Sequence, residues 1–150
     1  MHALRSFIIT TIFLLCSTLT QAATIMETLE GNDVDLASLK GKWVFINYWA
    51  SWCGPCLDEI SELNHFYEDN KDGKVAVFAV NYDSLSIREQ QRLVRKFDIQ
   101  YPSLIHNTAR VLSLGPISVV PVTFVLNPDG NLSTTLYGGQ TVESLTEATG

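Results

Sequence analysis

The sequence predicts an α/β fold, in which a short β extension precedes a central mixed sheet with helices on both faces. Residues 43–50 form an aromatic and β-branched run typical of a strand, and residues 57–70 repeat apolar side chains at helical spacing. Residues 75–80 are almost continuously apolar, which is typical of a parallel strand that is covered on both faces. Residues 131–137 return after a turn at 127–130, which adds an antiparallel strand and makes the sheet mixed.

Length and composition indicate one domain with a hydrophobic core of ordinary size. The chain has 150 residues, of which 46% are hydrophobic, and its formal charge is −6. It contains no run of like charges, no internal repeat and no low-complexity tract. So acidic a surface argues against nucleic acid as a partner.

The first 22 residues resemble a secretory signal peptide. Arg5 precedes the apolar run at residues 7–19, and small residues stand at the −3 and −1 positions before a cleavage site after Ala22. We therefore expect a signal peptide at residues 1–22 and a domain at residues 23–150 that is periplasmic or otherwise extracytoplasmic, and soluble after cleavage.

Two alternatives to cleavage after Ala22 stay open. An uncleaved membrane anchor is one, although the apolar run is short for a bilayer. A lipoprotein is the other, although it needs a small residue before Cys16, where Leu15 stands. Cleavage would remove Arg5 and no acidic residue, so the formal charge would change from −6 to −7.

The segment before the main strand predicts the short β extension. Residues 25–31 suit a lead-in strand, residues 32–33 a turn, residues 34–36 a second extended piece, and residues 38–42 a loop. The aromatic strand at residues 43–50 follows.

The motif Trp52-Cys53-Gly54-Pro55-Cys56 lies where this strand gives way to a helix. The first helical turn carries unpaired N–H groups and the positive end of the helix dipole, which lower the pKa of a thiol placed there. Cys56 should lie roughly 5 Å from Cys53 between Cα atoms, within disulfide range. Pro55 suits an early helical position because its missing N–H would have no partner there. The spacing predicts attack by Cys53 on a disulfide and release of the mixed disulfide by Cys56.

Zinc binding and a purely structural disulfide are the two competing interpretations of the motif. Zinc needs further ligands, and beyond the signal segment the chain offers only His65 and His106 besides the two motif cysteines. A structural bond across so short a loop would constrain the unfolded chain little. We therefore favour redox exchange, with no metal and no cofactor.

A second helix is predicted after the buried strand at residues 74–82. Ser86 and Glu89 form a capping box that opens a helix extending to about Phe97. The core side of this helix is expected to consist of Ile87, Val94 and Phe97, with Leu93 beside them. Its basic residues, Arg88, Arg92, Arg95 and Lys96, form a solvated face, with docking of a partner as the alternative.

The last third of the chain predicts shorter elements. We expect a strand at residues 99–105, a helical turn at 108–114, strands at 117–126 and 131–137, and a short last helix capped by Thr141. Pro121 interrupts the longest of these strands, which by itself indicates an edge strand, a bulge or a cis peptide bond.

The chain resembles the thioredoxin superfamily, and within it the exported thiol:disulfide oxidoreductases of the TlpA/ResA/DsbE type, which include cytochrome c maturation proteins. The resemblance extends from about Leu29 to Leu145. Its most specific part is Lys40-Gly41-Lys42 with residues 46–56. Further matches are Asn81, Pro102, Pro121-Val122-Thr123-Phe124 and Asp129-Gly130. The resemblance implies a thioredoxin-like fold.

The resemblance also implies a role for each residue of the motif and its neighbours. Cys53 would be the exposed nucleophile and Cys56 the buried resolving thiol. Pro121 would be a cis-proline against the disulfide, the backbone of Val120 would pair with the substrate chain, and Trp52 would offer a contact surface.

Glu59 stands where the ResA-like branch has an acidic residue. It follows Cys56 by three positions, so on a helix it would be a neighbour that could relay the proton of Cys56; a solvated helix acid is the alternative. Asn47 replaces the buried Asp of cytoplasmic thioredoxins and cannot exchange a proton. Val119 replaces a Gly of many relatives, which predicts a narrower or differently shaped substrate-facing loop.

The Gly54-Pro55 dipeptide favours a reductase, because thioredoxin, which shares it, has a potential near −270 mV against about −120 mV for the oxidant DsbA. A reductase in an oxidising compartment needs a membrane electron donor, which relatives find in partners of the DsbD/CcdA kind. The expected substrate is a protein disulfide, with apocytochrome c, a copper-site protein and general periplasmic disulfides as candidates. We expect a monomer.

Three other functions are compatible with the sequence. A disulfide oxidant or isomerase would use the same residues at a higher potential. A thiol peroxidase would need a P-x-x-x-T-x-x-C context, which the chain lacks. A non-enzymatic client-binding module would hold its clients without exchange.

Overall fold

The computed structural model describes residues 24–71, 73–105 and 107–150. The predicted signal peptide at residues 1–22 and its cleavage site lie outside these residues. Within them, no helix combines the length and the apolar character needed to cross a membrane.

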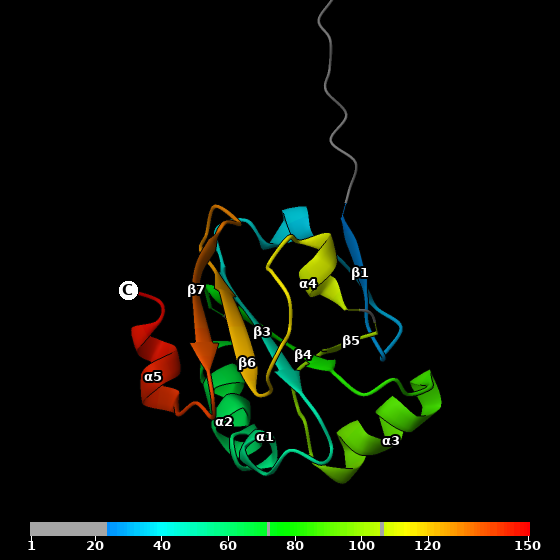
Figure 1. Cartoon of the computed structure of the whole chain (residues 1–150). Coiled ribbons are helices and arrows are strands. Elements are labelled where there is room, and N and C mark those ends of the chain that lie inside the picture. The colour runs from blue at the N-terminus through cyan, green and yellow to red at the C-terminus, as the bar shows by residue number, and fades with distance from the viewer. Residues whose placement is uncertain (1–23, 72, 106) are drawn as a thin grey trace, which may run out of the picture.

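A five-stranded mixed sheet forms the centre of the domain, with strand order β5-β4-β3-β6-β7 (Figure 1). β4 pairs parallel with β3 and β5, whereas β6 pairs antiparallel with β3 and β7. The strands are β3 Trp43–Trp49, β4 Val75–Asn81, β5 Ser103–Leu104, β6 Val122–Leu126 and β7 Leu132–Tyr137. The predicted mixed sheet is confirmed.

A separate antiparallel pair, β1 Ile25–Glu27 with β2 Asp33–Asp35, forms the predicted N-terminal extension. A short 3-10 helix, Leu36–Leu39, connects it to β3 where a loop was expected. The α-helices are α1 Gly54–Asp58, α2 Ile60–Asn70, α3 Ile87–Lys96, α4 Thr108–Val111 and α5 Val142–Glu147.

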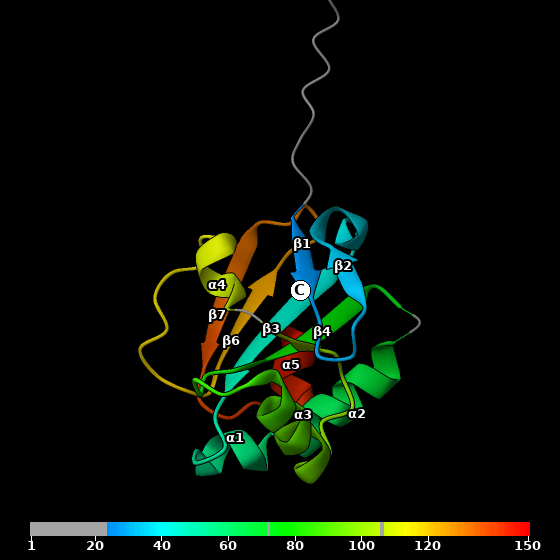
Figure 2. The same cartoon turned by 90° about the vertical axis from the view of Figure 1, so that its right-hand side faces the viewer.

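The sheet separates two hydrophobic cores, because successive side chains of a strand point to opposite faces. Phe45 faces the core beneath α1, α2, α3 and α5, whereas its neighbours Val44 and Ile46 face the core beneath α4 and the β1–β2 pair. Figure 2 shows the two sets of elements on opposite sides of the sheet. Helices therefore cover both faces, as predicted.

Several predicted elements are shorter or more broken than expected. The helix after the motif is interrupted at Glu59, which ends α1 and begins α2 with φ −80° and ψ −11°. Of residues 117–126 only Val122–Leu126 join the sheet, and of residues 99–105 only Ser103–Leu104.

The expected core side of α3 is wrong at one position. Ile87 is 49% exposed, whereas Gln90 is buried beside Leu93. Gln90 can occupy a core position because its side-chain amide donates a hydrogen bond to the carbonyl oxygen of Leu85. The capping box of Ser86 and Glu89 is confirmed.

Candidate active site

The two motif cysteines form a disulfide at the junction of β3 and α1. Cys53 is the N-cap of α1, and its Sγ accepts a hydrogen bond of 3.2 Å from the backbone N–H of Cys56. The Cα atoms of the two cysteines are 5.2 Å apart, close to the expected separation. Pro55 lies in the first turn, where its missing N–H leaves no intrahelical bond unmade.

Cys53 is more exposed than Cys56, as expected, but the difference is small. Cys53 keeps 5% of its surface exposed and Cys56 keeps none. In this oxidised form Cys53 is therefore buried rather than openly exposed, and of the two cysteines it is the one that keeps some exposed surface.

The loop before β6 lies against the disulfide. The Val120–Pro121 peptide bond is cis, as the resemblance implies. The carbonyl oxygen of Val120 lies 3.6 Å from Cys53 Sγ, and the carbonyl oxygen of Pro121 accepts a hydrogen bond from Gly138 at the end of β7. The motif and the loop before β6, which are distant in sequence, thus meet at Cys53 Sγ.

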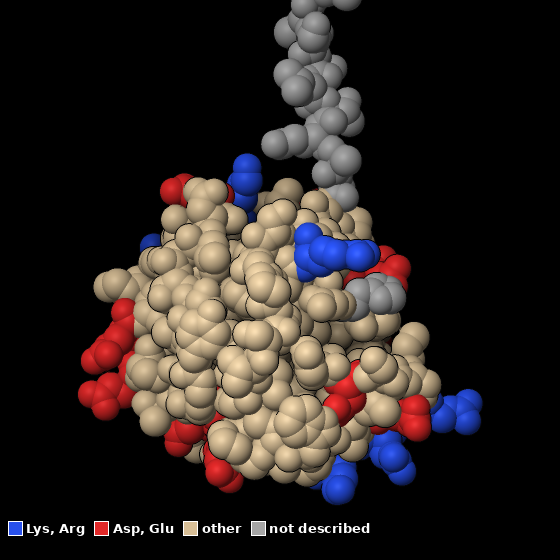
Figure 3. Space-filling view, viewed as in Figure 1, with Lys and Arg blue, Asp and Glu red and all other residues tan. Residues whose placement is uncertain are grey.

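Exposed apolar side chains surround this point. Trp52, next to Cys53, is 68% exposed, and Val119, next to Val120, is half exposed. Figure 3 shows that the surface over β6 and β7 is largely uncharged, whereas acidic side chains lie near α1 and toward the edges of this face. Such a surface suits contact with an uncharged stretch of a partner chain.

Glu59 lies in the interior beneath the motif, only 2% exposed, so the alternative of a solvated helix acid is wrong. Its Oε1 accepts a hydrogen bond of 2.7 Å from the Asn47 side chain, and its Oε2 accepts one of 2.9 Å from the backbone N–H of Gln140. Burial raises the pKa of Glu59 to about 7, although the two hydrogen bonds oppose that rise. The carboxyl group can therefore gain or lose a proton near neutral pH.

Asn47 and Tyr101 complete the surroundings of Glu59. Asn47 also donates to the hydroxyl of Thr123 on β6, so its amide joins three elements of the core. The Tyr101 hydroxyl is buried with no hydrogen-bond partner among the described residues. Burial and then the charge of Glu59 raise the pKa of Tyr101 well above its ordinary value, so the phenol stays protonated.

The sequence analysis missed two contributors to the site. Asp83 binds Ser51 and Trp52 at the start of the motif. A polar residue just beyond the buried strand β4, which neighbours β3, was an available signal. Gln140 acts through its backbone N–H, which leaves no mark on the residue type.

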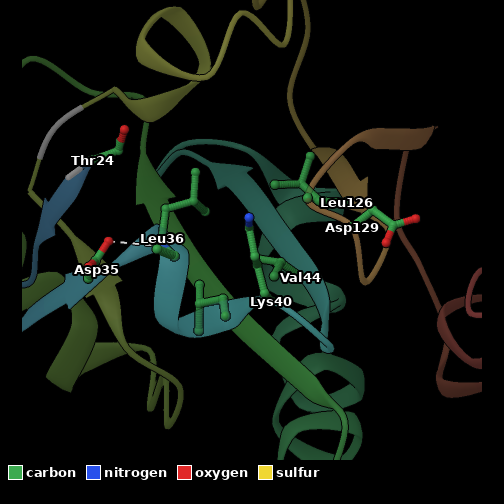
Figure 4. A pocket seen from close by; sticks show the side chains of 10 residues that line it. Thr24, Asp35, Leu36, Lys40, Val44, Leu126 and Asp129 are labelled. Atoms are coloured by element: carbon green, nitrogen blue, oxygen red, sulfur yellow. Dashed lines mark hydrogen bonds between the residues drawn. The ribbon is translucent and has the colours of Figure 1, made fainter. Parts of the chain in front are cut away.

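A hollow lies at the end of the sheet opposite the disulfide. This cavity of about 400 Å³ is lined by aliphatic side chains of the 3-10 helix, β3 and β6, with Lys40 among them (Figure 4). It lies at the start of β3, whereas the disulfide follows the end of β3. Among the described residues, no three His, Cys, Asp or Glu side chains gather in a way that could hold a metal ion.

Comparisons with known proteins agree with this architecture. The profile of the AhpC/TSA family matches residues 19–135. A thiol-disulfide oxidoreductase ResA of Bacillus cereus is 31% identical over 121 residues, which make up 81% of this chain and 69% of ResA.

Two solved structures are similar throughout the domain. StoA from Bacillus subtilis matches with a TM-score of 0.70 and 26% identity, covering 85% of this chain and 96% of StoA. A DsbF homologue from Corynebacterium diphtheriae matches with a TM-score of 0.72 and 32% identity, covering 84% of this chain and 82% of the other. With its Cys53–Cys56 disulfide on a thioredoxin-like fold, the chain belongs to the AhpC/TSA family and is a thiol-disulfide oxidoreductase of the ResA type.

Proposed function

We propose that this enzyme is an extracytoplasmic reductase of protein disulfides, in which Cys53 attacks and Cys56 resolves. The observation that carries the proposal is the arrangement of the two sulfurs. Cys53 caps α1 beside the Val120 carbonyl, and Cys56 lies fully buried one helical turn later with Glu59 three residues beyond it.

The first step uses the thiolate of Cys53. In the reduced protein the N–H of Cys56 and the dipole of α1 stabilise this thiolate. It attacks one sulfur of the client disulfide and forms a mixed disulfide. The client S–S bond breaks, and the leaving client thiolate takes a proton from solvent.

The second step uses Cys56. Its thiol gives up a proton, for which we propose Glu59 as the acceptor, and its sulfur attacks Cys53 Sγ. The Cys53–Cys56 disulfide forms and the second client thiol leaves, so that two electrons have moved from the dithiol to the client. The disulfide in the structure corresponds to this oxidised product. A membrane dithiol donor of the DsbD/CcdA kind would reduce it again.

The client is proposed to bind across Trp52, Val120 and Pro121. The exposed side chains of Trp52 and Val119, next to Cys53 and Val120, support a contact with an extended apolar segment of the client. The predicted signal peptide supports an extracytoplasmic client, of which apocytochrome c is one candidate.

Trapping tests the mechanism. With Cys56→Ala, we expect mixed disulfides to accumulate through Cys53 and to disappear on reduction. Cys53→Ala is the matched control, and it should trap nothing. Clients that stay bound after both thiols are lost would indicate a binding module and would contradict the proposal.

Redox titration tests the direction of electron flow. A reductase should have a potential well below about −180 mV, toward that of thioredoxin. A value above about −180 mV would assign the same residues to an oxidant or isomerase.

A further inference from the structure

The carboxylate of Asp83 accepts three hydrogen bonds from Ser51 and Trp52, the two residues before Cys53. Its Oδ1 accepts a hydrogen bond of 2.7 Å from the indole Nε1 of Trp52. Its Oδ2 accepts two hydrogen bonds of 3.1 Å, from the backbone N–H and from the hydroxyl of Ser51. One carboxylate thus binds both residues that lead into Cys53.

Asp83 is itself held in place by the end of the sheet. Its backbone N–H donates to the side-chain oxygen of Asn81, the last residue of β4. The adjacent N–H of Tyr82 donates to the carbonyl oxygen of Trp49, the last residue of β3. Because β3 and β4 are parallel neighbours, their carboxyl ends place Asp83 beside the motif.

The bond to Asp83 is notable because Trp52 is otherwise open to solvent. The side chain is 68% exposed, yet its one polar atom is bound to a carboxylate. An exposed aromatic ring would normally sample several rotamers and lose that freedom on binding. A ring that is already held loses less, so it binds a partner more tightly. Tryptophan is also among the residues that contribute most to interfaces.

On the basis of the proposed function, we propose that Asp83 is a positioning residue, which holds Trp52 and Ser51 in the orientation that a client protein meets at Cys53. Asp83 acts through Trp52 and makes no contact with the reacting sulfurs. Its loss therefore weakens the binding of a large disulfide substrate and leaves the exchange chemistry of Cys53 intact.

Two disulfide probes of different size separate binding from chemistry. Insulin is a protein disulfide that can contact Trp52, and dithiobis(nitrobenzoate) is a small aromatic disulfide that reports sulfur attack directly. The reduced full-length mature protein is mixed with each probe in a single turnover. The dependence of the rate on probe concentration gives a half-saturation concentration and a limiting rate.

We expect Asp83→Ala to raise the half-saturation concentration for insulin by about three- to tenfold, with the limiting rate and the nitrobenzoate reaction changed less than about twofold. Trp52→Phe keeps an aromatic ring but removes the indole donor, so it should give a similar defect. The double variant should be no worse than either single variant, because the two residues act as one unit. Asp58→Asn removes an exposed carboxylate from α1 and serves as the charge control.

A second variant and a second readout cover the case in which Asp83→Ala folds poorly. Asp83→Asn keeps one acceptor oxygen for Trp52 and should give an intermediate defect. Hydrogen exchange of the Trp52 indole N–H, assigned by its absence in Trp52→Phe, should be faster in both Asp83 variants.

Three outcomes would overturn the inference. They are Asp83 variants that match Asp58→Asn with insulin, equal losses with both probes, and an unchanged indole exchange rate. A wild-type protein that reduces neither probe would instead contradict the proposed function, so the two failures are distinguishable.

Discussion

The Asn47 side-chain amide and the Glu59 carboxylate meet at 2.7 Å in the interior of the domain, one on β3 and the other between α1 and α2. Both residues are almost fully buried. The amide supplies a donor that favours the ionised carboxylate, and burial opposes ionisation more strongly, so the pKa of Glu59 rises to about 7. An acid is thereby kept beneath the motif in a state that can change protonation at neutral pH.

Replacing Glu59 with Gln should slow the resolving step and remove its pH dependence near 7. In the wild-type protein the rate should rise with pH through about 7, because only the ionised carboxylate accepts the Cys56 proton. We expect a loss of about 10²-fold above that pH, the lower end of general-base contributions. Dithiobis(nitrobenzoate) measures this step, since release of the second thiol product reports attack by Cys56. Asp58→Asn is the control, and an unchanged profile in Glu59→Gln would exclude the proton-relay role.

The same raised pKa should make the stability of the oxidised protein depend on pH. Below about pH 4.5 Glu59 is protonated in both the folded and the unfolded protein, and above about pH 7 it is ionised in both. Between these pH values it is ionised only in the unfolded chain. The free energy of unfolding should therefore fall by about 3 kcal/mol as the pH rises from about 4.5 to about 7. Urea denaturation of wild type and Glu59→Gln measures the difference. A difference that stays constant, or grows in favour of the wild type, would contradict this assignment.

Replacing Asn47 with Ala should shift the titration of Glu59 upward. The amide lowers the pKa of Glu59, so its loss leaves the burial effect less opposed, and the pH at which the resolving rate rises should increase. Thr123→Val is the matched control, because it removes the other hydrogen bond of the Asn47 amide and leaves the contact with Glu59. An equal shift in both variants would indicate a general loosening of the core.

The position of the two cysteines followed from local sequence, because a buried strand and a helix meet at the motif within a few residues. Glu59 could be placed near Cys56 by helical spacing, but its hydrogen bond from the backbone N–H of Gln140 comes from a residue 81 positions further along the chain. Asp83 likewise reaches Trp52 only through the parallel pairing of β3 with β4. Such contacts join residues far apart in the chain, so local sequence patterns do not pair them; for Asp83 the only signal was its place just after a buried strand.

The error at Ile87 has a different cause. Periodicity alone assigns apolar residues to the core side of a helix. Here the polar Gln90 is accepted in the core because a backbone carbonyl of Leu85 satisfies its amide, and Ile87 remains exposed in the first turn. A polar residue can be buried at little cost when it has a hydrogen-bond partner, but a pattern of apolar residues does not predict its burial.

The capping box of α3 should contribute measurably to stability. The Ser86 hydroxyl accepts a hydrogen bond from the backbone N–H of Glu89, and the Glu89 carboxylate accepts bonds from the N–H and hydroxyl of Ser86. We expect Ser86→Ala to lower the free energy of unfolding by about 1 kcal/mol. Denaturation in urea measures the change, with Ser84→Ala in the preceding loop as the control. Equal values for the two variants would show that the cap is not formed in solution.

The last helix, α5, should be an integral part of the fold although it is only six residues long. Leu145 is fully buried against the core that contains the disulfide, and the N–H of Val142 donates to the carboxylate of Glu62 on α2. Leu145→Ala should therefore lower the free energy of unfolding by about 2–5 kcal/mol, the usual result of emptying a buried leucine site. Glu147→Ala changes an exposed residue of the same helix and should cost little. A small effect of Leu145→Ala in urea denaturation would mean that α5 detaches without loss of the core.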